Sequence, residues 1–350
     1  MAADLQRERD DPAAEAAALR RHAIDAEYYD LPRRRSLAER AADAAGRLDV
    51  RLGRTIFGHT TPALNTLRGR LRLRHARAAR RAEAGSVDPG FTRFAERGFI
   101  HLPEGLFGPR LIAAIAATLA ERIEDDRHSI RTGQNLALQE RLLPGRVYAR
   151  RLIDPRDITE IEALAGDEMR QVVEGCYRSH FAILSVEGYR IHHVEPEIRR
   201  RIDAYSHWWH LDQRPVDICK VFINLSRVTP EDGPFTITSI DTSRRLLKNH
   251  AYRGRTDADF ELADEQWQGG GAAQLLGPPG SAMLCNTQIC LHRAGVPAPG
   301  RHRDVLQLVL AASMRPLPIQ WLAATDPLFG KRSRYYRPPP GKPRRTNSDM

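Results

Sequence analysis

The sequence predicts a mainly β domain of the sandwich or barrel type, with flanking helices and a helical N-terminal extension. From residue 180 onward, short β-rich runs alternate with Gly/Pro turns. Before that point, apolar residues recur at helical spacing. Strands and helices do not alternate regularly, as they would in a doubly wound parallel sheet. With 350 residues, of which 41% are hydrophobic, the chain is long enough to bury a full core.

The extension covers residues 1–85, which are rich in Ala and Arg and read as helical. Ser36 is a suitable N-cap for a helix that starts at Leu37, and Gly85 is a stop signal. A turn-rich link follows at 86–90, so we place the start of the main domain at residue 86 and its end at 326.

Within the main domain the expected elements are short. The helices are predicted over 91–97, 109–123 and 158–176. The strands are predicted over 98–102, 181–186, 216–225, 235–239, 282–285 and 305–310.

The formal net charge of +10 comes from two short stretches. Residues 68–81 carry seven Arg and 331–345 carry seven Lys or Arg, with no acid in either, so the rest of the chain has a formal charge of −4. The second stretch lies in a basic, Pro-rich tail over 327–350 that should be extended or disordered. We interpret both as solvated or acid-pairing surfaces. Binding to nucleic acid or anionic lipid is the alternative, but no RNA-binding aromatic signature or Cys/His finger supports it.

Composition also bears on location. The longest nearly uncharged apolar stretch, 111–120, is about half of the ~20 residues that cross a bilayer, so we expect no membrane span. The first residues are crowded with Arg and Asp and lack the apolar core of a secretion signal. The four cysteines form no C-x-x-C pair, which argues against a zinc ribbon or a disulfide framework. We therefore expect a cytoplasmic protein.

The most informative motif is an H-x-D triplet at His210 and Asp212, directly before a predicted strand. Side chains on an extended chain alternate, so the imidazole and the carboxylate project from the same face. Completed by a second His, such a pair forms the facial triad that holds non-haem Fe(II) and leaves positions open for co-substrate and dioxygen. The best candidate for the third ligand is His292, which lies in a strand and turn 82 residues after His210.

Two cationic side chains accompany these residues. Arg303 opens an apolar strand, where a desolvated guanidinium needs an anionic partner. The carboxylate of a bound small molecule would supply one. Lys220 shares strand parity with Phe222 and Asn224, and it is either a snorkelling edge residue or a co-substrate contact.

Other histidines offer competing assignments. His193 and Glu195 form an H-x-E pair, but a Pro and a charged run follow them, which favours a surface loop. His207 is three residues before His210 and therefore on the opposite face of a strand. His302 is an alternative to His292, although its charged neighbours favour exposure.

Together these motifs resemble the phytanoyl-CoA dioxygenase family of Fe(II)/2-oxoglutarate-dependent oxygenases, over roughly residues 91–315. The resemblance rests on the H-x-D triplet, on Glu-Asp-Gly-Pro at 231–234, on Leu-His-Arg-Ala-Gly at 291–295, on the Arg 11 positions after His292, and on the segment 94–100. One departure is Ser-Ile-Asp-Thr-Ser at 239–243, where the family usually has Gly-Ser-His.

The resemblance implies a double-stranded β-helix, a cupin-like jelly roll, with iron in the barrel mouth. It implies that His210, Asp212 and His292 bind Fe(II) and that Arg303 binds 2-oxoglutarate, with dioxygen as the second co-substrate. We therefore expect an oxygenase that hydroxylates an unactivated C–H bond of a small-molecule substrate. Desaturation, epimerisation and ring formation begin with the same hydrogen abstraction and stay open at this point. A catalytically silent jelly-roll binding or scaffold protein is the second hypothesis, and a basic nucleic-acid-binding protein is the third.

Overall fold

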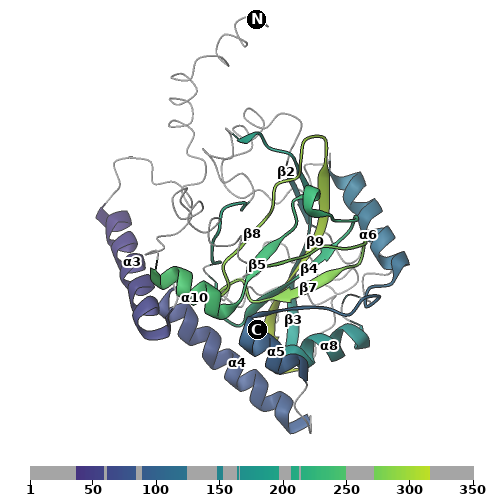
Figure 1. The fold of residues 1–350 in the computed structure, drawn as a ribbon. Helices are drawn as coiled ribbons and strands as arrows, with labels where there is room; N and C mark the ends of the chain where they lie inside the picture. The colour runs from purple at the N-terminus through teal and green to yellow at the C-terminus, as the bar shows by residue number, and fades with distance from the viewer. Residues whose placement is uncertain are drawn as a thin grey trace, which may run out of the picture.

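Two antiparallel sheets form the core of the protein, shown as a computed structural model in Figure 1. The structure describes residues 37–58, 61–83, 89–123, 148–152, 164, 166–196, 206–212, 214–249 and 272–315. The larger sheet has the strand order β1-β7-β4-β9-β3-β2. These strands are β1 (Phe99–His101), β7 (Ala282–Cys285), β4 (Ile218–Asn224), β9 (His302–Ser313), β3 (His180–His192) and β2 (Tyr148–Leu152).

The smaller sheet has the order β6-β5-β8. Its strands are β6 (Ala272–Gln274), β5 (Thr236–Thr238) and β8 (His292–Arg293). An antiparallel bridge between His210 and His292 places the H-x-D segment beside β8, where it extends this sheet. The protein is thus mainly β with flanking helices, and its core is a jelly roll, as predicted.

Alternation along β4 separates the two faces of the larger sheet. Cys219 and Val221 belong to an apolar cluster shared with the helices, whereas Phe222 belongs to a second cluster shared with the smaller sheet. Lys220 and Asn224 have the same parity as Phe222 and therefore lie on that inner face, as the sequence predicts. The inner face consequently carries polar side chains in an otherwise buried layer.

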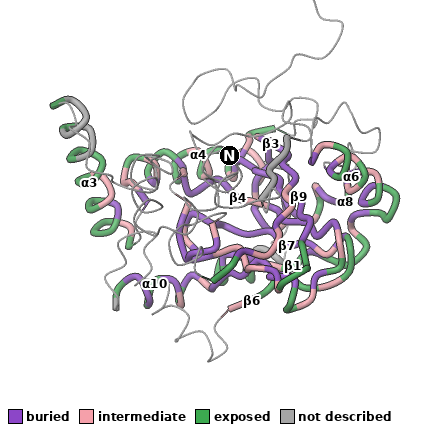
Figure 2. Tube along the Cα trace, turned by 90° about the horizontal axis from the view of Figure 1, so that it is seen from above, coloured by how far each residue is buried: buried purple, intermediate pink, exposed green. Residues whose placement is uncertain are grey.

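Three helices pack near the larger sheet: α5 (Pro89–Arg97), α6 (Pro109–Arg122) and α8 (Asp167–Tyr177). In α6, the buried residues Leu111, Ile115 and Leu119 recur every fourth position, which makes one apolar stripe. The stripe joins the large apolar cluster on the outer face of the sheet. Figure 2 shows that burial is concentrated in the central strands, while α3 is mostly exposed.

The N-terminal extension contains two described helices, α3 (Leu37–Phe57) and α4 (Ala63–Glu83). α3 begins at the residue predicted for it, and Ser36 and Gly85 lie outside the described residues. α4 packs closely on the domain through Gly69, because a Cβ at this position would stand 2.6 Å from the backbone nitrogen of Val216. A larger residue at position 69 would push α4 away from the main domain.

Several arginines of the basic helix α4 form ion pairs and hydrogen bonds with the main domain. Arg72 forms an ion pair with Asp217 (3.2 Å), and Arg80 forms one with Glu174 (3.7 Å). Arg77 donates a hydrogen bond to a backbone carbonyl of the domain. These contacts agree with the acid-pairing interpretation of the stretch 68–81. The basic tail at 327–350 lies outside the described residues.

The structure also differs from the predicted elements. The helix expected over 158–176 is described only as α8, and 158–163 lie outside the described residues. Helix α10 (Ile240–Asn249) was not predicted, and it occupies the segment where the family motif departs. The short strands β2 and β6 were also missed, because neither Tyr-Ala-Arg-Arg-Leu nor Ala-Ala-Gln alternates clearly between apolar and polar residues. Among the described helices, none combines the length and apolar character of a bilayer-crossing segment.

Candidate metal centre

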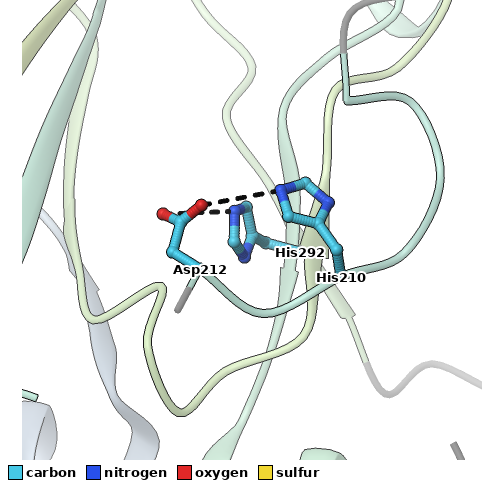
Figure 3. A group of neighbouring side chains, drawn as sticks. All are labelled: His210, Asp212 and His292. Atoms are coloured by element: carbon cyan, nitrogen blue, oxygen red, sulfur yellow. Dashed lines mark ion pairs between the residues drawn. The ribbon is translucent and has the colours of Figure 1, made fainter. Parts of the chain in front are cut away.

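Three side chains that are distant in sequence meet at the edge of the smaller sheet (Figure 3). Each of His210, Asp212 and His292 offers a ligand atom, and these atoms all lie within 4.8 Å of one another. Nε2 of His210 is 3.8 Å from Oδ1 of Asp212, and Nε2 of His292 is 3.8 Å from Oδ2. Both imidazoles are buried and the carboxylate is partly exposed. Within the described part of the chain, no other three His, Cys, Asp or Glu residues gather in this way.

Strand pairing explains why the three side chains converge. His210 and His292 exchange both backbone N–H···O hydrogen bonds at 3.1 Å, so they form a directly opposed antiparallel pair with side chains on the same face. Their ring centroids are 4.1 Å apart. Asp212 is two residues beyond His210, and its N–H is fixed by the carbonyl of Thr287 at 2.9 Å. The parity inferred from the sequence therefore holds in the structure.

Backbone carbonyls set the tautomer of both imidazoles. Nδ1 of His210 is 2.7 Å from the carbonyl oxygen of Trp208, and Nδ1 of His292 is 3.1 Å from that of Cys290. A carbonyl only accepts hydrogen bonds, so each Nδ1 carries the proton and donates it. When the ring is neutral, Nε2 is then the unprotonated nitrogen, and both Nε2 atoms lie on the side of Asp212. This is the usual arrangement behind a metal-binding His.

The carboxylate of Asp212 is held by two donors. The Thr287 hydroxyl donates to Oδ2 at 2.6 Å, and Nζ of Lys220 lies 2.6 Å from the same oxygen. Burial alone would raise the pKa of Asp212. The Lys220 ammonium, the positive charge that His292 and His210 carry whenever they are protonated, and the Lys220 hydrogen bond outweigh it, so this pKa is held well below its usual value. Asp212 is therefore an anion, as a metal ligand must be.

Arg303 lies on the inner face of β9 and is buried. Its Nη1 donates a hydrogen bond to the carbonyl of Gly233. Two residues further along the chain is Phe235, whose ring centroid is 5.8 Å from that of His292. The guanidinium therefore contacts the turn that leads into Phe235, next to the metal centre.

The loop that receives Arg303 requires a glycine. Gly233 has φ +63°, and a Cβ there would stand 2.4 Å from the carbonyl carbon of Val296. The neighbouring Asp232 is anchored by Arg301, with Nε to Oδ1 at 2.6 Å. The Glu-Asp-Gly-Pro motif is thus a rigid turn that places a carbonyl for Arg303.

The competing histidines lie elsewhere. Nδ1 of His193 is 2.8 Å from the carbonyl oxygen of Pro297, and its partner in the H-x-E pair, Glu195, is largely exposed. The ring of His207 packs edge-on against Trp208. His302 is exposed and contacts the ring of His192.

Sequence reasoning missed Thr287 and the two carbonyls behind the imidazoles. Thr287 lies within Asn-Thr-Gln at 286–288, which matches no ligand-spacing pattern. The carbonyls belong to residues 208 and 290, each two positions before a histidine. The two-residue offset between carbonyl and histidine can be recognised once both histidines are placed in extended segments. No particular residue type at positions 208 and 290 indicates it from the sequence.

No family model and no curated protein sequence matches the chain. Several solved structures share part of its architecture. HygX from Streptomyces hygroscopicus, with nickel and 2-oxoglutarate bound, is 18% identical, covering 71% of this chain and 96% of that one, with a TM-score of 0.46. The epimerase SnoN, in complex with Fe3+, alpha ketoglutarate and nogalamycin RO, is 17% identical over 69% and 93%, with a TM-score of 0.46. EctD from S. alaskensis, with 2-oxoglutarate and 5-hydroxyectoine, is 15% identical over 69% and 83%, with a TM-score of 0.43. The resemblance to the phytanoyl-CoA dioxygenase family stays a prediction.

Proposed function

We propose that the protein is an Fe(II)- and 2-oxoglutarate-dependent oxygenase that hydroxylates an unactivated C–H bond of a small-molecule substrate. The observation that carries the proposal is the donor set of the metal centre. Two imidazoles, each locked through Nδ1 by a backbone carbonyl, offer Nε2 beside an anionic carboxylate. A set of two His and one carboxylate with open positions is typical of non-haem Fe(II) oxygenases.

The residues of this chain fit such a metal ion. His210, Asp212 and His292 would hold Fe(II): adjacent ligand atoms that each lie about 2.0–2.2 Å from one ion stand roughly 3 Å from each other, so the 3.8 Å separations between Nε2 and carboxylate oxygen need only a small contraction. When bound, Fe(II) with 2-oxoglutarate and dioxygen supplies the oxidising chemistry that no protein side chain provides.

The surrounding residues would bind and orient 2-oxoglutarate and would exclude water from the metal centre. Arg303 is a buried fixed cation, suited to the distal carboxylate of 2-oxoglutarate through paired N–H donors. The rings of Phe222 and Phe235 pack 4.2 Å apart between the sheets, and Phe235 also faces His292. This apolar wall keeps water from the metal centre and strengthens the electrostatic contacts inside it.

Anaerobic titration tests the proposal. Adding Fe(II) and 2-oxoglutarate to the full chain should produce a weak visible charge-transfer band, and admitting air with a substrate should release succinate. Asp212→Ala should abolish the band, whereas His193→Ala, a histidine outside the centre, should leave it unchanged. Absence of the band in the unsubstituted protein at saturating Fe(II) and 2-oxoglutarate would refute the proposal. A band without succinate release across a panel of small metabolites would favour the silent binding or scaffold protein instead.

A further inference from the structure

Lys220 contacts the metal centre directly. It lies at the centre of β4, with β7 on one side and β9 on the other, paired with Cys285 and Val309. Both partners are fully buried, and the Lys220 side chain is only 12% exposed. A buried ammonium on such an apolar wall needs an anion, and the carboxylate it contacts is Asp212.

The two oxygens of that carboxylate are not equivalent. Oδ2 accepts from both the Lys220 ammonium and the Thr287 hydroxyl, at 2.6 Å each. A carboxylate oxygen has about two lone-pair sites, so these two donors occupy Oδ2. Oδ1, 3.8 Å from Nε2 of His210, retains its lone pairs for a metal ion.

The register of the larger sheet separates Lys220 from the other cation of the site. Lys220 is opposite Val309, which is six residues along β9 from Arg303. At about 3.3 Å per residue this puts the two Cα positions ~20 Å apart along the strand. The ammonium contacts the metal-ligand carboxylate, and the guanidinium contacts the Gly233 turn. The two cations therefore contact different groups on the inner face.

We propose that Lys220 is a positioning residue of the metal centre, which acts together with Thr287 by holding Oδ2 of Asp212 so that only Oδ1 is offered to the metal. This inference rests on the proposed function and assigns to Lys220 a role other than co-substrate contact. A carboxylate that binds through one oxygen leaves three positions open on a six-coordinate ion. Two are needed for the chelating end of 2-oxoglutarate and one for dioxygen. Two-oxygen binding would remove one of them.

Co(II) is the probe for the test, because its visible spectrum reports the number and geometry of its ligands and needs no turnover. We compare the unsubstituted full chain with Lys220→Met, Lys220→Arg and Thr287→Val, and with Lys248→Met, an exposed lysine at the end of α10, as the matched control. Lys220→Met should change the Co(II) spectrum, because the second carboxylate oxygen then takes a position that is otherwise open to water. Lys220→Arg should restore the unsubstituted spectrum, Thr287→Val should shift it in the same direction as Lys220→Met, and Lys248→Met should have no effect.

Titration of each Co(II)-loaded protein with 2-oxoglutarate separates the two roles of Lys220. Lys220→Met should change the apparent Kd for 2-oxoglutarate much less than Arg303→Met does. An unchanged Co(II) spectrum in both Lys220→Met and Thr287→Val would overturn the proposal. A loss of 2-oxoglutarate affinity equal to that of Arg303→Met would also overturn it, in favour of direct co-substrate contact. If the unsubstituted protein bound no Co(II), the proposed function itself would fail. If Lys220→Met does not fold, Thr287→Val and Lys220→Arg carry the test.

Discussion

Two buried clusters in this protein combine imidazole with carboxylate, and they differ in the distance between the imidazole nitrogen and the carboxylate oxygen. In the first, Nδ1 of His180 is 2.8 Å from Oε2 of Glu174, which is also paired with Arg170 and Arg80. In the metal centre the closest imidazole-to-carboxylate distances are 3.8 Å, too long for a hydrogen bond. In the Glu174 cluster the carboxylate pairs directly with the imidazole and the two arginines, whereas in the metal centre the carboxylate is close to the two imidazoles but not in direct contact with them. The spacing, rather than the residue types, distinguishes a ligand set from a structural network.

Removing the carboxylate of the metal centre should have the largest effect on function. Asp212→Ala deletes one of three ligands, so metal affinity should fall by more than the ~100-fold that loss of a residue behind a ligand costs. Turnover should be lost with it. Metal content after dialysis and succinate release measure the two effects. Retention of bound iron and activity in this variant would contradict the assignment.

The corresponding change in the other cluster should affect stability and leave metal binding intact. Glu174→Ala leaves His180 and Arg170 without their buried partner, and breaking a buried ion pair costs about 3–5 kcal/mol of unfolding free energy. Chemical denaturation measures the loss, and Co(II) binding below the transition should match that of the unsubstituted protein. Weakened metal binding in the folded variant would mean that the two clusters are not independent.

Arg303→Met should weaken 2-oxoglutarate binding without weakening metal binding, unlike a substitution of a metal ligand. Loss of a charge-assisted hydrogen-bond pair costs about 1.5–3 kcal/mol, so the KM for 2-oxoglutarate should rise by roughly 10–100-fold. Metal affinity measured without 2-oxoglutarate should stay within a few-fold of the unsubstituted value. A KM that does not change would remove Arg303 from the site.

A third buried carboxylate, Asp217, should make the stability of the protein depend on pH. Burial raises the pKa of Asp217 to about 6 in spite of the Arg72 charge. In the unfolded chain this group titrates near 3.9, so it stabilises the fold fully below about pH 4 and loses this contribution as the pH rises through 6. The loss is about 3 kcal/mol at most. Asp217→Asn should therefore flatten the decrease in unfolding free energy between pH 4 and 6.5, measured by urea denaturation. Parallel curves for the two proteins would contradict the raised pKa.

Local sequence was enough to predict the elements that have strong periodicity and the common face of the two candidate ligands that share an extended segment. The parity of the H-x-D triplet and of Lys220 with Phe222 depends only on the two-residue repeat of an extended chain. Helix α10 escaped prediction because its buried apolar residues, Ile240, Leu246 and Leu247, are separated by Asp, Thr and Ser, which also favour turns. Thr287 escaped because a hydroxyl that supports a ligand has no spacing rule.

The sequence by itself determined which side chains face the interior and that two imidazoles, a carboxylate and a guanidinium were available there. Only the tertiary structure decided which atoms meet. The pairing of His210 with His292, the contact of Lys220 with Asp212 and the turn that receives Arg303 all join strands that are distant in the chain. Their physical origin is the register of the two sheets, which is set by hydrogen bonds between strands and by the packing of both faces.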